Sequence, residues 1–242
     1  MSDRKPMAIA IPTHEYGGQG AGYLSRLLNT IATQTFQDFS IFISDQSTSG
    51  DIQDVVNSYS SQFDIAYSRN DQKDNPTQNI NTALRMAQGD IVKVMFMDDF
   101  FYATDALAII KDRMEGPDAP WAMNSIIHYT ELAGEYHRNM EPYWNPQMLS
   151  GANSLGSPSS MSYRKDIEMP FDEYLRMFVD VELYCRYHEA YGPPLIIPET
   201  LTVSCFNMAP SATDRLIENN DEYVKLYEQE KEYCRNKHAR NL

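Results

Sequence analysis

Residues 91–99 read Ile91-Val92-Lys93-Val94-Met95-Phe96-Met97-Asp98-Asp99, a mostly apolar run that ends in two adjacent carboxylates. A short run of this composition predicts a buried strand. Two neighbouring carboxylates at the end of such a strand lose hydration and repel each other, so holding them together is costly unless a cation or a basic group compensates. The stretch therefore predicts a buried sheet and, at the end of this strand, a cation site.

Similar segments precede this strand along the chain. Three apolar runs predict further strands, at Met7–Ile11, Phe39–Ile43 and Phe63–Tyr67, the first of them ending at Pro12. Apolar residues at helical spacing predict the helices between them, over 24–31, 52–59, 75–87 and, after the acidic pair, 104–114. Pro76 suits the first turn of the third helix, and Gly89 suits its C-terminal cap. This alternation predicts an α/β fold with a mostly parallel sheet and helices on both faces.

The second half of the chain has a different character. Residues 117–170 are rich in Pro, Gly, Asn and Ser and predict only short segments. A helix is expected over 171–190, short strands over 195–197 and 201–204, and a charged helical tail over 214–240. No internal repeat or low-complexity linker interrupts residues 1–242, so one domain is expected.

Composition excludes several classes of function. The net charge of −14 repels the phosphate backbone, so no nucleic-acid partner is expected. No stretch approaches the roughly 20 apolar residues of a membrane span, and no signal peptide is recognisable at the N-terminus, so we expect a cytoplasmic protein. The three cysteines are widely spaced and predict reduced thiols rather than disulfides or a zinc site.

Three polar clusters follow the predicted parallel strands, at Pro12-Thr13-His14-Glu15, Asp45-Gln46-Ser47 and Asp98-Asp99. In an open parallel sheet the carboxyl ends of the strands form the ligand site, so these clusters are expected to meet there. Mg²⁺ and Mn²⁺ prefer oxygen ligands and share their coordination between carboxylates and substrate phosphates. Two plainer interpretations stay open: Asp99 caps the next helix while Asp98 is solvated, and Asp45 merely stabilises a turn.

The glycine-rich stretch Gly17-Gly18-Gln19-Gly20-Ala21-Gly22 lies where dinucleotide-binding folds carry their phosphate loop. The GxGxxG spacing fails, because it requires glycine at Tyr23 or at Ser25. We therefore expect a flexible loop over a ligand rather than an NAD site.

Candidate residues in the second half are fewer. Asp180 and Glu182 lie among apolar residues of a predicted helix, where a carboxylate with a raised pKa can act as a general base. Two surface acids on an amphipathic helix are an equally good interpretation. Trp121, Tyr143 and Trp144 suit either a sugar-stacking platform or the core. No HExxH, GxSxG or GxxxxGK[ST] motif is present, which removes the usual zinc-hydrolase, serine-hydrolase and P-loop signatures.

Taken together, the motifs resemble the family 2 glycosyltransferases. The segments that carry the resemblance are Ile9–Thr13, Leu27–Phe36, Phe42–Ser47, Asn79–Leu84, Ala87–Ile91 and Met97–Asp99. The likeness covers roughly residues 7 to 205, with a looser match toward the C-terminus. It implies a GT-A fold with a nucleotide-sugar-binding half (7–115), a smaller acceptor-binding half (116–210) and a helical tail (211–242). It also implies an inverting sugar transfer from a nucleotide-diphospho-sugar, for which a UDP-sugar is the expected donor, to a glycan or another hydroxyl acceptor.

The resemblance also implies a role for each matching position. Thr13 and Glu15 would flank the base and ribose, Asp45 would meet the base, and Asp98 would lie near the ribose. Asp99 would hold Mn²⁺ or Mg²⁺ on the diphosphate, with Asp98 beside it, and Asp180 would be the catalytic base. The remaining assigned residues are Pro12 and Asn79 on the donor side, and Gly156, Ser157 and Trp144 on the acceptor side.

The sequence departs from the family pattern at two places. Many relatives have a second acid after the second strand, where this chain has Gln46, and a histidine in the C-terminal loop, where Phe206-Asn207-Met208-Ala209 has none. A catalytically weak GT-A domain that binds a sugar nucleotide or a glycan is therefore an alternative. A nucleotidyltransferase is less favoured, because its first loop usually carries a basic residue and here none precedes Arg26.

Overall fold

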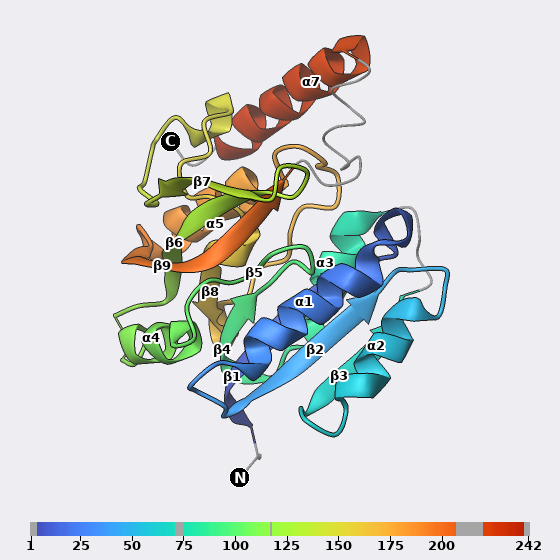
Figure 1. Ribbon diagram of the computed structural model, residues 1–242. Coiled ribbons are helices and arrows are strands. Elements are labelled where there is room, and N and C mark those ends of the chain that lie inside the picture. Colours follow the sequence, from blue (N-terminus) through green and yellow to red (C-terminus); the bar gives the residue numbers. More distant parts are fainter. Residues whose placement is uncertain (1–3, 71–74, 117, 207–219, 240–242) are drawn as a thin grey trace.

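The structure is a computed structural model that describes residues 4–70, 75–116, 118–206 and 220–239. The strands are β1 (Lys5–Thr13), β2 (Phe39–Asp45), β3 (Ile65–Arg69), β4 (Gly89–Val94), β5 (Phe100–Phe101), β6 (Trp121–Thr130), β7 (Glu135–Met140), β8 (Met161–Arg164) and β9 (Leu195–Phe206). The α-helices are α1 (Gly20–Ala32), α2 (Asp51–Tyr59), α3 (Pro76–Met86), α4 (Ala106–Arg113), α5 (Val179–Tyr191) and α7 (Asn220–His238). The strands form one sheet in the order β3-β2-β1-β4-β8-β6-β9-β5, with β7 paired to β6 (Figure 1).

The first four strands form the parallel part of the sheet. β1 lies between β2 and β4 and runs parallel to both, and β3 runs parallel to β2. The register places Thr13 opposite Asp45 and Asp45 opposite Arg69. The carboxyl ends of these strands therefore meet at one edge, as the sequence predicted.

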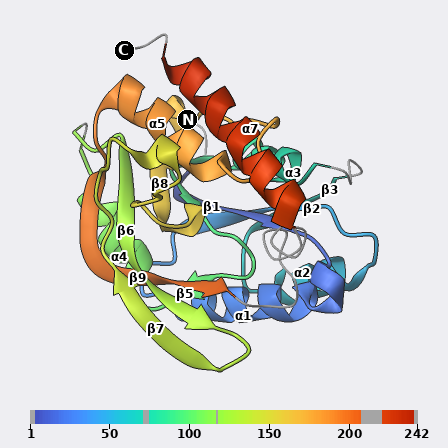
Figure 2. The ribbon, with the colours of Figure 1, turned by 90° about the horizontal axis from the view of Figure 1, so that it is seen from above.

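Both faces of the parallel part are covered, because successive side chains of a strand point to opposite faces. Met7, Ile9 and Ile11 belong to the core packed under α1, α2 and α4. Ala8 and Ala10 belong to a second core, shared with α3, α5 and α7. Figure 2 shows α1 and α2 on one side of the sheet and α3, α5 and α7 on the other. This double burial explains the nearly unbroken apolar sequence of the strands.

The second half contributes more strand than its composition predicted. β6 and β7 form a hairpin within 121–140, where only short segments were expected, and the two short strands predicted over 195–204 are one continuous strand, β9. β8 runs antiparallel to both β4 and β6, and β9 runs parallel to β6. Strand pairing with distant residues overrode the local Pro- and Gly-rich signals here.

Two predictions about glycines were wrong. The stretch 17–22 is not a loop throughout, because α1 begins at Gly20, where a Cβ would lie 2.1 Å from the carbonyl oxygen of His14. Gly89 does not cap α3 but begins β4, where a Cβ would lie 2.4 Å from the backbone nitrogen of Ala8. Both glycines permit a close approach of two backbones, which a local pattern does not reveal.

Several helices and strands begin or end at other residues than the sequence predicted. Asn75 caps α3 and Pro76 occupies its first turn as predicted, whereas β1 continues through Pro12 to Thr13. α5 begins at Val179 rather than at residue 171. Of the predicted tail, residues 214–219 lie outside the described residues, and α7 covers Asn220–His238. No helix in the described part of the chain is long and apolar enough to cross a membrane.

Candidate active site

Asp45 is the centre of a hydrogen-bonded group at the ends of β1, β2 and β3. Its fully buried carboxylate accepts hydrogen bonds from the Ser47 backbone nitrogen at 2.9 Å, the Tyr67 hydroxyl at 2.7 Å and Arg69 Nη1 at 3.0 Å. The Thr13 hydroxyl lies 3.3 Å from the same carboxylate. The structure thus brings Thr13 and Asp45 together, and both carboxylate oxygens already have protein donors.

Asn79 and Glu15 tie further segments to this edge. Asn79 is buried on α3, donates to the carbonyl oxygen of Thr13 at 2.9 Å and accepts from the Ser44 hydroxyl at 2.7 Å. Glu15 accepts from the Thr48 backbone nitrogen at 2.6 Å and from its hydroxyl at 2.7 Å. Burial raises the pKa of Glu15, but the hydrogen bonds from Thr48 outweigh it and hold this pKa below its ordinary value. Glu15 is therefore a carboxylate that Thr48 holds in place next to the carboxyl ends of β1 and β2. Pro12 is buried near the end of β1.

The acidic pair lies in the turn that follows the apolar run. Asp98 is partly exposed, and its carbonyl oxygen accepts from Arg26 of α1 at 2.8 Å. The Asp99 side chain is only 4% exposed. Its carboxylate accepts from the backbone nitrogen of Cys205 at 2.8 Å and from the Ser157 hydroxyl at 3.4 Å. The end of β9 and the loop before β8 thus converge on Asp99, which does not act as a simple helix cap.

The electrostatics of this pair suit a divalent cation. Burial raises the pKa of both carboxyls, and the charge of Asp98 raises the pKa of Asp99 further. A bound cation would remove this penalty. No group of three or more His, Cys, Asp and Glu side chains within the described ranges is arranged to hold a metal. Two adjacent carboxylates are a donor set that Mg²⁺ or Mn²⁺ accepts when phosphate and water supply the remaining ligands.

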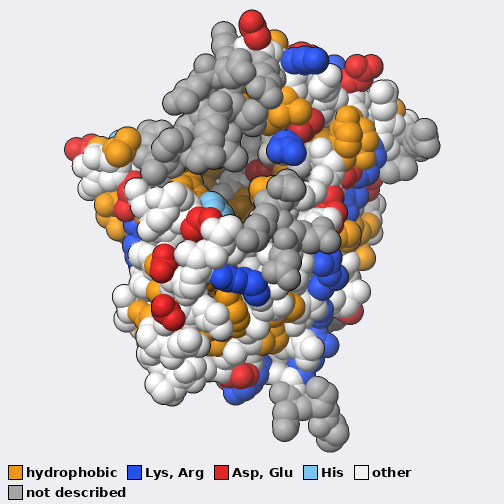
Figure 3. All heavy atoms as spheres, turned by 90° about the vertical axis from the view of Figure 1, so that its right-hand side faces the viewer, with side chains coloured by type: hydrophobic (Ala, Val, Ile, Leu, Met, Phe, Trp, Pro, Cys, Tyr) orange, Lys and Arg blue, Asp and Glu red, His pale blue; other side chains and the backbone are white. Residues whose placement is uncertain are grey.

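A short loop links the acidic pair to Asp180. Ser157 contacts Asp99, and the carbonyl oxygen of the preceding Gly156 accepts from Asn153 Nδ2 at 2.9 Å. The same Asn153 nitrogen donates to Asp180 Oδ2 at 2.7 Å. The Asp99 carboxylate and the Asp180 carboxylate therefore stand on either side of residues 153–157. Figure 3 faces the side toward which β1 and β2 run in Figure 1, and it shows a hollow with acidic, apolar and histidine side chains around it.

Asp180 lies in the first turn of α5 and is partly buried. Its Oδ1 accepts from the backbone nitrogen of Val181 at 2.8 Å. Burial raises the pKa of Asp180 to about 6, even though its hydrogen bonds oppose the rise. A carboxylate with this pKa is ionised at neutral pH and is a stronger base than an ordinary aspartate. Glu182, by contrast, pairs with Arg186 at 2.8 Å and is fully buried.

Lys93 is a fully buried lysine on β4, the strand that precedes the acidic pair. Its ammonium group, on β4, donates to the carbonyl oxygen of Ser159 at 2.6 Å and to Asn124 Oδ1 at 3.0 Å. Burial lowers the pKa of Lys93 to about 7, and the charge of Asp99 opposes that shift. Ser159 Oγ also accepts from the backbone nitrogen of Phe96, so Lys93 and Phe96 together fix the loop that carries Ser157.

The three candidate stacking aromatics differ in their surroundings. Trp121 is fully buried and belongs to the core, whereas Tyr143 is 61% exposed. Trp144 is partly buried and stacks on His188 of α5, with ring centroids 3.7 Å apart. One face of Trp144 is thus already occupied by an imidazole ring.

Sequence reasoning missed four residues that shape the site: Tyr67, Arg69, Asn153 and Lys93. Arg69 could have been suspected from its place two positions beyond the end of the predicted strand Phe63–Tyr67. Asn153 gives no local signal, because its partners Gly156 and Asp180 are brought to it by the folding of a loop. The C-terminal loop in which a histidine was sought lies, from residue 207 on, outside the described residues.

Known proteins resemble this chain both in a sequence family and in fold. The family model described as Glycosyl transferase family 2 matches residues 8–170. No curated protein sequence matches the chain.

Similar solved structures include residues 1–349 of S. aureus TarS, with 16% identity and a TM-score of 0.64 over 82% of this chain and 60% of that chain. The same TarS fragment in complex with UDP is 18% identical, with a TM-score of 0.63 over 87% of this chain and 62% of that chain. The mannosyltransferase PcManGT from Pyrobaculum calidifontis, in complex with GDP-Man and Mn²⁺, is 14% identical, with a TM-score of 0.61 over 89% of this chain and 60% of that chain. These likenesses confirm the expected GT-A fold, and the chain spans about 60% of the length of these structures.

Proposed function

This chain belongs to glycosyl transferase family 2, and from that premise we propose that it transfers a sugar from a nucleotide-diphospho-sugar to an acceptor hydroxyl with inversion at the anomeric carbon. One observation carries the proposal. Residues 153–157 contact Asp99 at one end and Asp180 at the other, so a cation-demanding acidic pair and a basic carboxylate border the same loop. Neighbours that bind UDP and GDP-Man support a nucleotide-sugar donor, and we propose a UDP-sugar first.

The donor would occupy the carboxyl edge of β1, β2 and β4. Thr13, Glu15 and Asp45 are proposed to surround the base and ribose, with Asn79 and Pro12 fixing the strand ends beneath. Since the Asp45 oxygens already accept several hydrogen bonds, Asp45 holds Tyr67 and Arg69 in place as well, so these two are proposed donor-side residues.

The diphosphate would lie at the acidic pair. Asp99, with Asp98 beside it, is proposed to hold Mn²⁺ or Mg²⁺, which supplies Lewis-acid stabilisation of charge on the leaving diphosphate. The Mn²⁺ complex of the mannosyltransferase neighbour supports this choice. Asp98 would also approach the ribose. Lys93 keeps the Ser157 loop against Asp99, so that the carboxylates stay oriented when the donor arrives.

Asp180 would remove the proton of the acceptor hydroxyl while the acceptor oxygen attacks the anomeric carbon from the face opposite the leaving diphosphate. Its raised pKa makes it a competent base at neutral pH, and such a base contributes on the order of 10²- to 10⁴-fold to the rate. Gly156, Ser157 and Trp144 are proposed to line the acceptor side.

Calorimetric titration tests the donor site. UDP and GDP are titrated into the protein with and without Mn²⁺, and nucleotide binding is expected to strengthen with the metal. Asp99→Asn should abolish the effect of Mn²⁺, whereas Asp90→Asn, which alters a largely exposed aspartate on β4, should leave it unchanged. Nucleotide binding that is indifferent to Mn²⁺ in the unaltered protein would refute the metal site. The anomeric configuration of the product, read by NMR, decides inversion.

A further inference from the structure

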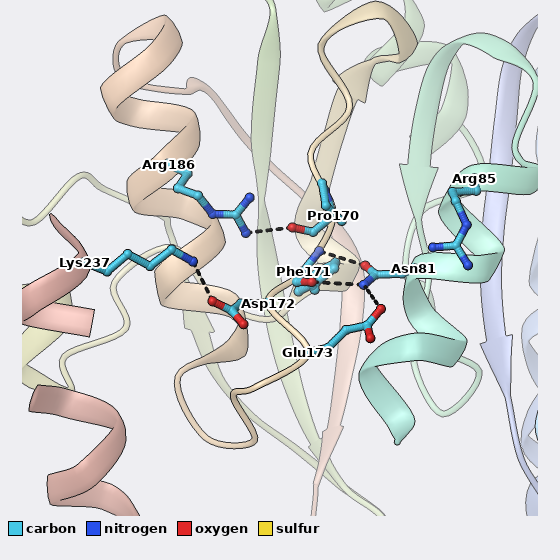
Figure 4. Close-up of a pocket in the computed structure, with 8 residues that line it drawn as sticks. All are labelled: Asn81, Arg85, Pro170, Phe171, Asp172, Glu173, Arg186 and Lys237. Atoms are coloured by element: carbon cyan, nitrogen blue, oxygen red, sulfur yellow. Dashed lines mark hydrogen bonds and ion pairs between the residues drawn. The ribbon is translucent and has the colours of Figure 1, made fainter. Parts of the chain in front are cut away.

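The helix α7 is attached to the segment that leads into α5. Its Tyr233 hydroxyl donates to Asp172 at 2.8 Å, and its Lys237 ammonium lies 2.5 Å from Asp172 and 2.7 Å from Glu182. Figure 4 shows the Lys237–Asp172 contact beside a cavity of about 450 Å³ at the junction of α3, α5 and α7. Arg186 closes the other side of this junction with a hydrogen bond to the carbonyl oxygen of Pro170. The C-terminal half of α7 is thus anchored on both sides of the α5 start.

Glu230, in the middle of α7, makes the most specific of these contacts. Its side chain, which is 1% exposed, accepts from the backbone nitrogens of three successive residues: Arg176 at 2.8 Å, Met177 at 2.8 Å and Phe178 at 3.1 Å. These N–H groups directly precede α5, and Phe178, at its N-cap position, provides no side-chain cap. Glu230 therefore fixes the three residues that lead into α5, and its negative charge near the N-terminus of α5 complements the helix dipole.

The same helix also contacts the loop that carries Asn153, the hydrogen-bond partner of Asp180. The Tyr227 hydroxyl of α7 donates to the carbonyl oxygen of Ser150 at 2.9 Å. Ser150 precedes by three residues Asn153, which donates to Asp180. Tyr227 also packs against the ring of Phe178, with centroids 5.2 Å apart. The helix α7 thus contacts both the residues that precede α5 and the loop that carries Asn153, the two segments that meet at the Asp180 carboxylate.

We propose that α7 is a clamp that sets the position of Asp180, with Glu230 and Tyr227 as its positioning residues. This inference rests on the proposed role of Asp180 as the base. Glu230 accepts a hydrogen bond from the backbone nitrogen of Phe178, two residues before Asp180, and Tyr227 fixes the loop whose Asn153 donates to the Asp180 carboxylate. Neither residue contacts the site at Asp99, so the clamp acts on the acceptor side and leaves donor binding alone.

Glu230→Gln probes the clamp with almost no change of volume. Glutamine keeps one acceptor oxygen and turns an NH₂ group toward buried N–H donors, so the start of α5 must shift. A misplacement of about 1 Å at a reacting group can cost on the order of 100-fold in rate. We expect kcat to fall by about 10- to 100-fold, with the affinity for UDP unchanged. Glu232→Gln, which removes an exposed charge two residues along α7, should retain full kcat.

Three measurements decide the proposal: kcat and KM of sugar transfer, the affinity for UDP with Mn²⁺, and amide hydrogen exchange over residues 176–181. Exchange at these amides should quicken in Glu230→Gln and not in Glu232→Gln. If Glu230→Gln does not fold, Tyr227→Phe takes its place, with the same expected loss of kcat at constant UDP affinity. Unchanged kcat, or UDP affinity that falls in parallel with kcat, overturns the clamp.

Asp180→Asn separates this inference from the proposed function. If Asp180→Asn abolishes transfer while Glu230→Gln and Tyr227→Phe keep the full rate, only the clamp is refuted. If Asp180→Asn itself keeps the full rate, the proposed role of Asp180 is refuted, and the clamp with it.

Discussion

Replacing Asp180 by asparagine tests its proposed role as the catalytic base and the effect of its partly buried charge on the free energy of unfolding. The substitution keeps the shape of the side chain and removes its charge. Because Asn153 Nδ2 donates to Asp180 Oδ2, the new amide must lose or rearrange that one hydrogen bond, at a cost of about 1 kcal/mol that does not depend on pH. Turnover should fall by on the order of 10²- to 10⁴-fold, with the affinity for UDP and Mn²⁺ unchanged.

The magnitude of the stability effect follows from the pKa. Folding raises the pKa of Asp180 from 3.8 to about 6, so the folded state holds this proton more tightly than the unfolded state. Asp180 therefore destabilises the fold above pH 6, and this cost disappears as the pH falls through 6 toward 4. About two pKa units correspond to roughly 3 kcal/mol. Because the side chain is partly exposed, solvent screening reduces the expected effect to about 1–2 kcal/mol.

The assay compares urea unfolding of the unaltered protein and the Asp180→Asn variant at pH 4.5, 6 and 8. The variant should gain about 1–2 kcal/mol relative to the unaltered protein between pH 4.5 and pH 8. In parallel, kcat/KM of the unaltered protein should rise with pH through about 6, being roughly tenfold below its plateau at pH 5. A stability difference that is flat with pH would refute the desolvated carboxylate, and retained turnover would refute the base.

Two further predictions concern the fold around the site. Gly20→Ala should lower the free energy of unfolding by about 1–3 kcal/mol, because the new Cβ would meet the His14 carbonyl oxygen. Gly22→Ala, in the same helix, places its Cβ in open space and should raise the free energy of unfolding by about 0.5–1 kcal/mol. Urea unfolding of both variants checks the two values, and equal effects would contradict the close approach at Gly20. Burial raises the pKa of Glu182, but the adjacent His238 and the hydrogen bonds from Arg186 lower it to about 2. Glu182 therefore stabilises the fold above pH 4.5, and this stabilisation is lost as the pH falls toward 2. Glu182→Gln should therefore cost roughly 3 kcal/mol at pH 7 and progressively less below pH 4.5 in unfolding measurements, and a cost that stays constant with pH would argue against the ion pair.

Local patterns predicted the parallel half of the sheet well. The apolar runs of β1, β2 and β4 are buried on both faces, so their sequences alone mark them as strands, and polar residues mark where they end. Parallel strands share one carboxyl edge, so Thr13, Asp45 and Asp99 could be assigned to that edge before any coordinates were known.

Local patterns failed where neighbours distant in the chain decide the conformation. β6 is a strand because it pairs with β7, β8 and β9, although no strand was predicted from its own segment, and pairing with β6 joins the two short strands predicted over 195–204 into β9. Gly20 and Gly89 are needed for close backbone approaches that only the packed chain creates.

The sequence by itself determined the sheet edge, its three polar clusters and the family to which they belong, since these depend on periodicity and on residues adjacent in the chain. Only the tertiary structure decided which groups surround each carboxylate. Asp99 meets Cys205 and Ser157, and Asp180 meets Asn153, across separations of 106, 58 and 27 residues. Glu230 reaches the start of α5 across more than 50. Such contacts arise from the burial of whole elements against one another, so no local spacing encodes them.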